Sequence, residues 1–583
     1  MDIFQQLRQD VVGIIENLGR DGQITQNLDT AHMTIESTRD LTHGDVACNA
    51  AMVLAKQAGV APRQLAEIII EALKKHPDVV SAECAGPGFI NIRLYPVVWQ
   101  RLLEHVVRVG GEYGQSHTGN KQTINVEWVS ANPTGPMHIG HARGAVFGDA
   151  LVRLLSKAGY HVVREYYIND AGSQVETLAR SAFLRYKEAL GETIEIPGGL
   201  YPGEYLKPIG AALASAYGKE LLGMEESQWL PVIKPFAIDK MMELIRSDLK
   251  DLGIEHDIFS SEQALHDQHK MDEVKAILED KGLLYKGVLE PPKGKLPDDW
   301  EPRDQVLFKS TQFGDDMDRP LQKSDGSWTY FASDIAYHLD KIQRGYNHMI
   351  LELGSDHKGY VKRMKAAVSA LSDQKAILEV KTHDLVNFLE DGIPVKMSKR
   401  AGKFATVRDV IDAVGKDIVR FVMLTRKNDV VLDFDLVKVQ EQSKDNPVFY
   451  VHYAHARAAS VLRLAQHQCP DALKDMKQNI HDVAARVQDE DYLSVIKQIA
   501  SFPRLVEQAA KAYEPHRVAF YLQELAASFH ALWNKGKEDN ALRFILEDNP
   551  AKTAAHLAVV QAVKVTIASG LGILNVTPLE EMV

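Results

Sequence analysis

Two short segments of the chain carry residues suited to handling a polyphosphate. The first is SANPTGPMHIGH at 130–141, and the second is KMSKR at 396–400. His138, Gly140 and His141 fall at the start of an expected helix, where unpaired backbone N–H groups and the helix dipole favour phosphate. The imidazoles can donate hydrogen bonds to phosphoryl oxygens, and glycine leaves room for a flat base. The ordinary alternative is that both histidines only cap and pack a surface helix, which the surrounding motif disfavours.

The second segment lies in an expected loop after a tight hairpin at Asp391-Gly392. Lys396 and Lys399 can act as compact positive charges toward a leaving pyrophosphate, and a loop can close over ATP and reopen. A basic run seen alone is usually a solvated surface. The two segments, more than two hundred residues apart, together predict one ATP site assembled from both.

The residues around the first segment predict a strand, a loop, a helix and a second strand. Residues 123–129 alternate branched or aromatic residues with polar ones, which is typical of a strand. Apolar residues then recur at helical spacing from His138, and Gly159 marks the expected end of that helix. A second strand follows over 161–168. The pattern is a βαβ unit with the two histidines on one helical face.

The composition is that of a large globular protein. The 583 residues, 45% hydrophobic and 25% charged, predict several domains. The three cysteines are widely spaced and form neither a disulfide framework nor a zinc pattern, so we expect a cytoplasmic protein. No apolar run of transmembrane length and no signal-peptide core is evident, so we expect no membrane contact. The net charge of −12 restricts any RNA contact to local basic patches.

The pattern of elements divides the chain into three expected parts. Residues 1–110 predict a small α+β domain, with helices first and then short strands near 79–84 and 89–94. A glycine-rich linker leads to an α/β nucleotide-binding domain over 120–405, which is long enough to need insertions. Strand signals nearly vanish beyond this point. Helical patterns rich in alanine, leucine and valine predict an all-α bundle over 406–583.

These segments resemble those of class I aminoacyl-tRNA synthetases, and most closely those of arginyl-tRNA synthetases, over almost the whole chain. The resemblance implies a Rossmann-like catalytic domain with insertions, an N-terminal domain that binds the tRNA elbow and a C-terminal helical domain that binds the anticodon. Besides the two ATP segments, it is carried by GDVACNAAMVLAK at 44–56, AGPGFINI at 85–92, YINDAG at 167–172, the run from Leu307 to His338, LGSDHKGY at 353–360 and NPVFYVHYAHAR at 446–457.

The resemblance implies that L-arginine attacks ATP to give arginyl-adenylate and pyrophosphate, and that the arginyl group then passes to the terminal adenosine of tRNA(Arg). Mg²⁺ and the two lysines would neutralise the leaving group. We expect a monomer. The resemblance also implies that activation depends on bound tRNA, yet Lys399, absent from many relatives, is present here. The implied ATP-binding residues are His138, Gly140, His141, Gly354, Asp356, Met397, Ser398 and Lys399.

Arginine specificity should come from carboxylates, because a guanidinium is planar and permanently cationic. Glu127 and Asp334 fall where the resemblance places substrate contacts. The alternatives are a strand-edge acid facing water for Glu127 and a dipole-stabilised residue near a helix start for Asp334. Tyr330 would share a helical face with Asp334. The expected arginine-binding set is Glu127, Ser130, Asn132, His141, Tyr330, Asp334 and His357, with the separate roles of Asp356 and His357 left open.

Contacts to tRNA are expected at both ends of the chain. Asn91, in an otherwise apolar strand, matches the family position associated with the D-loop, although its amide could equally satisfy a neighbouring loop. Tyr450, Tyr453 and Arg457 fall in the family's helix near the anticodon, where aromatic rings read unpaired bases by stacking. Aromatics at helical spacing are more often core, so we expect only part of this set to touch RNA. Arg143 is a further candidate, with a solvated surface arginine as its alternative.

Three other functions remain open at this point. Another class I synthetase is disfavoured by the carboxylate pair and the N-terminal domain. A small-metabolite nucleotidyltransferase with the same histidine motif would need no helical anticodon reader. A catalytically silent RNA-binding relative would have no physical need for His138, His141, Lys396 and Lys399 together.

Overall fold

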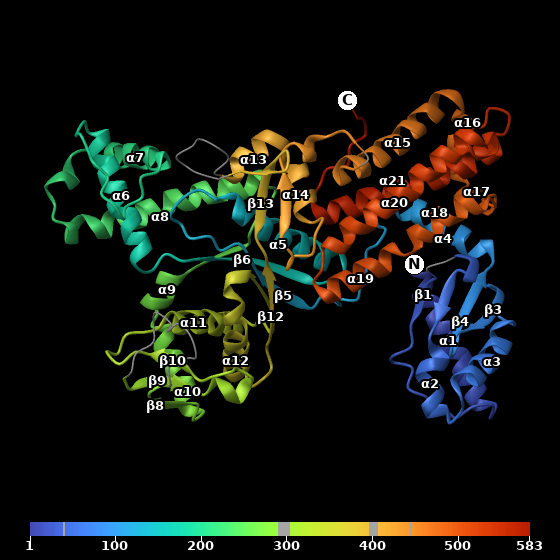
Figure 1. Ribbon diagram of the computed structural model, residues 1–583, viewed down its shortest axis with the longest axis horizontal. Helices are drawn as coiled ribbons and strands as arrows, with labels where there is room; N and C mark the ends of the chain where they lie inside the picture. Colours follow the sequence, from blue (N-terminus) through green and yellow to red (C-terminus); the bar gives the residue numbers. More distant parts are fainter. Residues whose placement is uncertain (39–40, 290–302, 396–405, 444, 583) are drawn as a thin grey trace. The chain divides into compact units, whose positions relative to one another are not determined.

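The computed structural model describes residues 1–583 except 39–40, 290–302, 396–405, 444 and 583 (Figure 1). Backbone contacts divide the chain into two compact units. The terminal unit consists of residues 1–116, 442–513 and 517–583, and the central unit of residues 117–441 and 514–516. Lys396, Met397, Ser398 and Lys399 lie outside the described residues.

A five-stranded parallel sheet organises the central unit, in the order β12-β11-β5-β6-β7. Because the connections diverge on either side of β5, this sheet has the arrangement in which ligands bind beyond the carboxyl ends of the strands. The predicted βαβ unit and the Rossmann-like fold are confirmed. The strands are β5 Thr123–Glu127, β6 His161–Ile168, β7 Ile258–Ser261, β11 His348–Gly354 and β12 Ile377–His383, and α5 Ile139–Lys157 connects β5 to β6.

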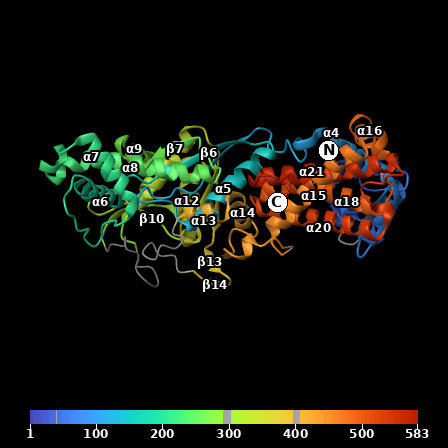
Figure 2. The same ribbon diagram turned by 90° about the horizontal axis from the view of Figure 1, so that it is seen from above.

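Two insertions extend this sheet. Between β6 and β7, helices α6 Ser173–Ala189, α7 Lys207–Tyr217 and α8 Glu226–Asp251 project away from the sheet in both views (Figures 1 and 2). The rings of Phe183 and Trp229 stack at 4.1 Å and hold α6 against α8. The second insertion, between β7 and β11, contains α9 Glu262–Asp267, α10 Lys270–Asp280, α11 Tyr330–Gln343 and the antiparallel strands β8 Leu284–Gly287, β9 Gln305–Phe308 and β10 Arg319–Gln322. Helix α12 Val361–Leu371 then joins β11 to β12.

A small third sheet follows the parallel one. The strands β13 Val386–Glu390 and β14 Ile393–Pro394 are antiparallel, which confirms the predicted hairpin at Asp391-Gly392. The strand β15 Leu432–Asp435, which pairs in parallel with β13, was not predicted from the sequence. Its Leu432 and Phe434 are buried, but four residues give little periodic signal. Helices α13 Val407–Val414 and α14 Lys416–Met423 lie between these strands in sequence, so residues 407–441 belong to the central unit by contact.

The terminal unit joins the two ends of the chain. Its antiparallel sheet has the order β1-β2-β4-β3, with helices α1 Ile3–Arg20, α2 Ala50–Ala58 and α3 Pro62–Leu73 beside it. Helix α4 Pro96–Val109 leads to the C-terminal helices, and Gln100 Nε2 donates to the carbonyl of Val487 at 2.8 Å. The strands are β1 Ile35–Ser37, β2 Val46–Cys48, β3 Val79–Ala85 and β4 Phe89–Leu94.

Seven α-helices lie among the described residues of the C-terminal part of the terminal unit. The last, α21 Pro550–Leu574, is by length and composition apolar enough to cross a membrane, but 78% of its apolar 18-residue window is buried, as is usual for a core helix. The others are α15 Pro447–Gln468, α16 Pro470–Gln478, α17 Ile480–Ala485, α18 Glu490–Ala500, α19 Phe502–Ala512 and α20 His516–Glu538.

Candidate functional site

The first ATP segment forms the loop between β5 and α5. His138 occupies the N-cap position, and its ring stacks on that of His141 with 3.7 Å between centroids. A side chain at Gly140 would lie 2.9 Å from the His138 ring, so glycine is required for this stacking. Burial, with the nearby His138 and His383, lowers the pKa of His141 to about 3. The low pKa keeps His141 neutral, so its ring can still donate one hydrogen bond.

A tight backbone reversal leads out of β5. Val129 and Ser130 have φ angles of 70° and 41°, in the left-handed region, and the Ser130 N–H donates to the Trp128 carbonyl at 3.0 Å. This turn places the Ser130 hydroxyl 3.0 Å from the backbone nitrogen of Tyr167, which donates to it, at the carboxyl end of β6. Asn132, which is exposed, donates to Gln174 Oε1 at 3.0 Å. Both predicted arginine contacts thus lie at the ligand-binding edge of the sheet.

Glu127 is neither exposed to water nor free of a partner. Lys341 Nζ lies 2.6 Å from Glu127 Oε2, and both side chains are buried. One turn further along the chain, Arg344 contacts Glu165, which is the neighbour of Glu127 across the sheet. One buried ion pair on α11 and one part-buried pair from Arg344, the residue directly after it, therefore anchor the C-terminal end of this helix to β5 and β6. The water-facing alternative for Glu127 is wrong.

The N-terminal half of the same helix carries Asp334, which is affected by the carboxylates of Glu262 and Glu127. Burial raises the pKa of Asp334 to about 7, and the charges of Glu262 and Glu127 add to the rise. A hydrogen bond with Tyr360 and the charge of Arg363 oppose the rise. Burial and Asp170 likewise raise the pKa of Glu262 to about 7. His266 Nε2 is 3.8 Å from Glu262. The result is a cluster of acids at the carboxyl edge of the sheet, in which Glu262 is buried and Asp334 is half-buried.

Glu262 was missed by the sequence analysis. It follows β7 directly, at the start of the six-residue helix α9, and comes close to β6 because Ile168 pairs with Ser261. Asp170, in the YINDAG segment, accepts from the Gln263 N–H at 2.8 Å and fixes this helix start. The available signal was an acid immediately after an expected strand, which in a parallel sheet lies at the ligand edge.

The remaining predicted residues of this site are more exposed. Tyr330 is the first residue of α11, one turn from Asp334, and is 80% exposed. Asp356 and His357, which follow Gly354 at the end of β11, are 3.5 Å apart with exposed side chains. A side chain at Gly354 would lie 2.5 Å from Asp356 Oδ1. The structure keeps these residues at the same sheet edge without separating their roles.

Arg143 is not an RNA contact. Its guanidinium is buried and donates to four backbone carbonyls, those of Asp384, Leu385, Lys427 and Val430, at 2.6–3.1 Å. This cation joins α5 to the starts of β13 and β15. Arg143 therefore stabilises the fold. Both predictions for it, an RNA contact and a solvated surface side chain, are wrong.

Comparisons with known proteins agree with this geometry. The arginine–tRNA ligase of Parvibaculum lavamentivorans is 55% identical over 583 residues, which covers 100% of both chains. That of Wolbachia pipientis wMel is 54% identical over 582 residues, again 100% of both. The chain belongs to the arginyl-tRNA synthetase family. Family models match in order: the arginyl-tRNA synthetase N-terminal domain at 5–94, the class I (R) catalytic domain at 103–196, the class I (I, L, M and V) synthetases at 322–436 and the DALR anticodon binding domain at 451–582.

Solved structures of the same family share the fold. The arginyl-tRNA synthetase of Thermus thermophilus superposes with a TM-score of 0.72 at 19% identity and covers 100% of both chains. That of Plasmodium falciparum gives 0.71 at 16% identity, covering 100% of this chain and 99% of the other. The fold class predicted from the sequence is confirmed.

In an arginyl-tRNA synthetase, the terminal unit is the expected place for tRNA contacts. Asn91 lies on β4 and, with Phe89 and Asn49, lines a groove of about 470 Å³. Arg457 lies between the rings of Tyr453 and Trp533, at 4.2 and 4.7 Å from their centres. Its Nη1 is 2.7 Å from His530 Nδ1, and the Tyr450 ring packs on the same histidine. Tyr453 is the exposed member of this cluster.

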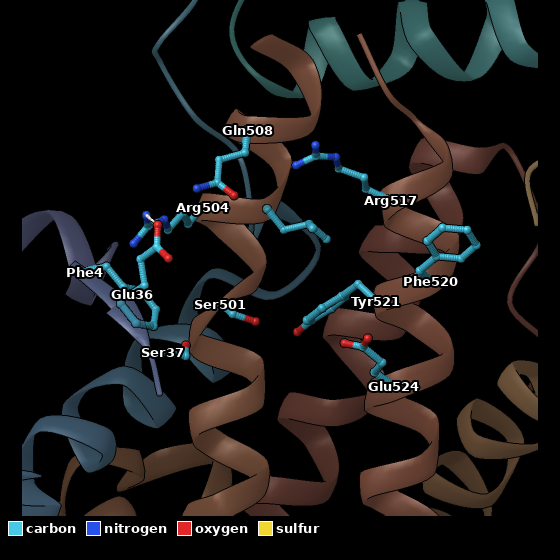
Figure 3. A pocket seen from close by; sticks show the side chains of 11 residues that line it. Phe4, Glu36, Ser37, Ser501, Arg504, Gln508, Arg517, Phe520, Tyr521 and Glu524 are labelled. Carbon is cyan, nitrogen blue, oxygen red and sulfur yellow. Dashed lines mark hydrogen bonds and ion pairs between the residues drawn. The ribbon is translucent and has the colours of Figure 1, made fainter. Parts of the chain in front are cut away.

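A second groove, of about 360 Å³, lies between the N-terminal part and the C-terminal helices of this unit (Figure 3). Arg504 on α19 is 3.2 Å from Glu36 on β1, and its guanidinium lies 5.6 Å from the ring centre of Phe4. Two arginines and two glutamates line the groove, so its charge favours no one ligand class. The ion pair instead fastens the N-terminal part to α19.

Proposed function

We propose that this chain binds arginine between the N-terminal half of α11 and the carboxyl ends of β5–β7, and binds ATP at the start of α5. As an arginine–tRNA ligase, it joins L-arginine to tRNA(Arg) in two steps. The observation that carries the arginine site is the neighbouring acids Asp334 and Glu262, whose raised pKa values indicate that a further cation would stabilise both. A guanidinium supplies that cation and can form forked hydrogen bonds to both carboxylates.

The pairing with Lys341 changes the role proposed for Glu127. Its charge is already compensated at 2.6 Å, so it is less suited to a second cation. We therefore assign the guanidinium to Asp334 and Glu262, with Tyr330 at the entrance. We assign the α-amino and carboxylate groups of arginine to Ser130, Asn132 and His141. Glu127 would border the amino end through Ser130, whose hydroxyl is 3.4 Å from Glu127 Oε1.

The first step needs positioning and charge stabilisation and no covalent protein nucleophile. The arginine carboxylate attacks the α-phosphorus, pyrophosphate leaves, and arginyl-adenylate forms. His138 and His141 at the N-terminus of α5 would donate to the phosphate oxygens. Lys396 and Lys399, outside the described residues, are proposed to face the pyrophosphate, and Gly354 and Asp356 the ribose.

Magnesium is proposed to arrive with ATP. No group of three or more histidine, cysteine, aspartate or glutamate side chains among the described residues could hold a metal ion by itself. Magnesium commonly keeps few protein ligands and binds substrate phosphates instead, so MgATP is the form of the nucleotide that this site suits.

In the second step, a ribose hydroxyl of the terminal adenosine takes the arginyl group and AMP leaves. We propose that Asn91 contacts the tRNA elbow and that Tyr453, with Tyr450 and Arg457 behind it, faces the anticodon. A cytoplasmic monomer without membrane contact is proposed for the whole chain.

ATP–pyrophosphate exchange across all amino acids, with and without tRNA(Arg), tests the proposal. Exchange driven by arginine is expected, and comparison of the two conditions measures the dependence on tRNA. Exchange driven by another amino acid would overturn the assignment of the pocket, and no exchange under any condition would indicate a silent relative.

A further inference from the structure

Met137 lies between Pro136, whose ring restricts the backbone, and His138. Both of its backbone polar groups form hydrogen bonds with segments that are distant in sequence. Its N–H donates to Asp248 Oδ2 at 3.2 Å, from the C-terminal end of α8. Its carbonyl accepts from the Val407 N–H at 2.9 Å, at the first residue of α13. The Met137 side chain is fully buried. The backbone on the N-terminal side of the catalytic histidine is therefore fixed from two directions.

Arg408 links these two holding segments. Its Nη2 lies 3.6 Å from Asp248 Oδ1, contacts the Asp251 carboxylate and donates to Ser247 Oγ at 3.3 Å. One arginine at the start of α13 thus binds the last turn of α8. Asp248 is the shared point, since one carboxylate oxygen meets Met137 and the other meets Arg408.

The charge on Asp248 depends on these two partners. Its side chain is almost completely buried, and burial raises its pKa, while the Met137 N–H and the Arg408 guanidinium act in the opposite direction and Asp409 adds to the rise. A buried carboxylate without such partners is expensive to keep charged. Removal of Arg408 should therefore weaken the hydrogen bond from the Met137 N–H to Asp248 as well as the contact between α13 and α8.

We propose that Asp248 and Arg408 are positioning residues for adenylate formation: they fix the Met137 peptide, and through it His138, relative to α13. This inference rests on the proposed function. Neither residue contacts the carboxylates assigned to arginine, so its loss should lower kcat rather than raise the arginine KM. Displacement of a catalytic group by about 1 Å can cost up to about 100-fold in rate.

The test measures arginine-dependent ATP–pyrophosphate exchange by the full chain with tRNA(Arg) present, for Asp248→Asn, Arg408→Gln, Arg408→Lys and the double variant Asp248→Asn/Arg408→Gln. Asparagine can still accept from Met137 but cannot pair with arginine. Arg164→Gln is the matched control, because Arg164 loses a similarly exposed ion pair, to Asp257 at 2.6 Å, without touching Met137. Arg408 is half-exposed, so its variants keep the test valid if the Asp248 variant does not fold.

We expect kcat to fall about tenfold in Asp248→Asn and in Arg408→Gln, with the arginine KM changed less than about twofold. The double variant should be no slower than either single one, and lysine at 408 should recover most of the rate. Wild-type kcat in both single variants, an equal loss in Arg164→Gln, or a rise in arginine KM in place of the kcat loss would overturn the proposal. Absence of arginine-dependent exchange in the unmodified chain would instead count against the proposed function.

Discussion

The two halves of helix α11 treat acids in opposite ways. At its C-terminal half, Lys341 and Arg344 neutralise Glu127 and Glu165. At its N-terminal half, burial and the charges of Glu262 and Glu127 raise the pKa of Asp334, and Arg363 and a hydrogen bond with Tyr360 only partly offset that rise. Although burial opposes it, Lys341 and Arg344 lower the pKa of Glu165 to about 2, whereas those of Asp334 and Glu262 rise to about 7. An acid held by a buried lysine serves the fold, and an acid whose pKa is raised by burial and neighbouring acids is suited to a cationic substrate.

The largest effect should come from removing the internal partner. Lys341→Met leaves Glu127 buried without its cation, and loss of one member of a buried pair costs about 3–5 kcal/mol of unfolding free energy. Denaturant unfolding of the variant measures it. Lys365→Met is the control, since it breaks an exposed pair with Glu379 and should cost at most about 1 kcal/mol. Equal costs in the two variants would remove the distinction between the halves of α11.

Asp334→Asn should raise the arginine KM about 100-fold, because loss of one charge from a desolvated, hydrogen-bonded pair typically costs 2–5 kcal/mol or more. The ATP KM should stay within about twofold, since ATP binds at α5. Steady-state exchange kinetics with each substrate varied in turn measure both values. Equal changes in the two would mean that Asp334 does not hold the guanidinium.

Glu262→Gln should have a smaller effect of the same kind, about tenfold on the arginine KM, because glutamine keeps one hydrogen-bond acceptor. The same variant should unfold at higher temperature than the parent at pH 8 without arginine, since a repulsive buried charge has gone. A loss of stability with an unchanged arginine KM would place Glu262 with Glu127 as a structural acid.

The smallest effect concerns pH. With pKa values about 7, Asp334 and Glu262 lose protons as pH rises, so the arginine KM should fall about threefold between pH 6.5 and 7.5. In the ligand-free protein the native state holds more protons than the unfolded state between about pH 4 and 7, so stability should decrease over that window. Thermal unfolding without arginine across this range checks the sign, and a rise would contradict the pKa assignment.

Local patterns were sufficient to predict one side of this site but not the other. The strand, loop and helix around His138 follow from alternation, turn residues and helical spacing within one stretch of chain. Glu262 could not be found in this way because the parallel pairing of β6 and β7 brings it to the site, and Lys341 could not because it reaches Glu127 from α11, far away in sequence. Asp334 was found only through family resemblance.

Contacts of single side chains were the least predictable feature. Arg143 looks like a surface cation in the sequence, yet four carbonyls bury it. His455 lies in the segment expected to face the anticodon, but it is buried and bonded to the Leu579 carbonyl at 2.7 Å. In both cases the partners are backbone groups that no residue pattern marks.

The reversal at Val129 has a consequence for thermal tolerance. A β-branched residue at φ 70° is strained, and such a conformation costs about 1–3 kcal/mol. Glycine would adopt the same turn without that strain, yet would let the backbone sample many other shapes before folding. The valine thus makes the loop that presents Ser130 stiff at the expense of global stability. On heating, the turn at Val129 and Ser130 should lose its ordered conformation first. Loss of arginine affinity is therefore expected to precede unfolding of the surrounding sheet.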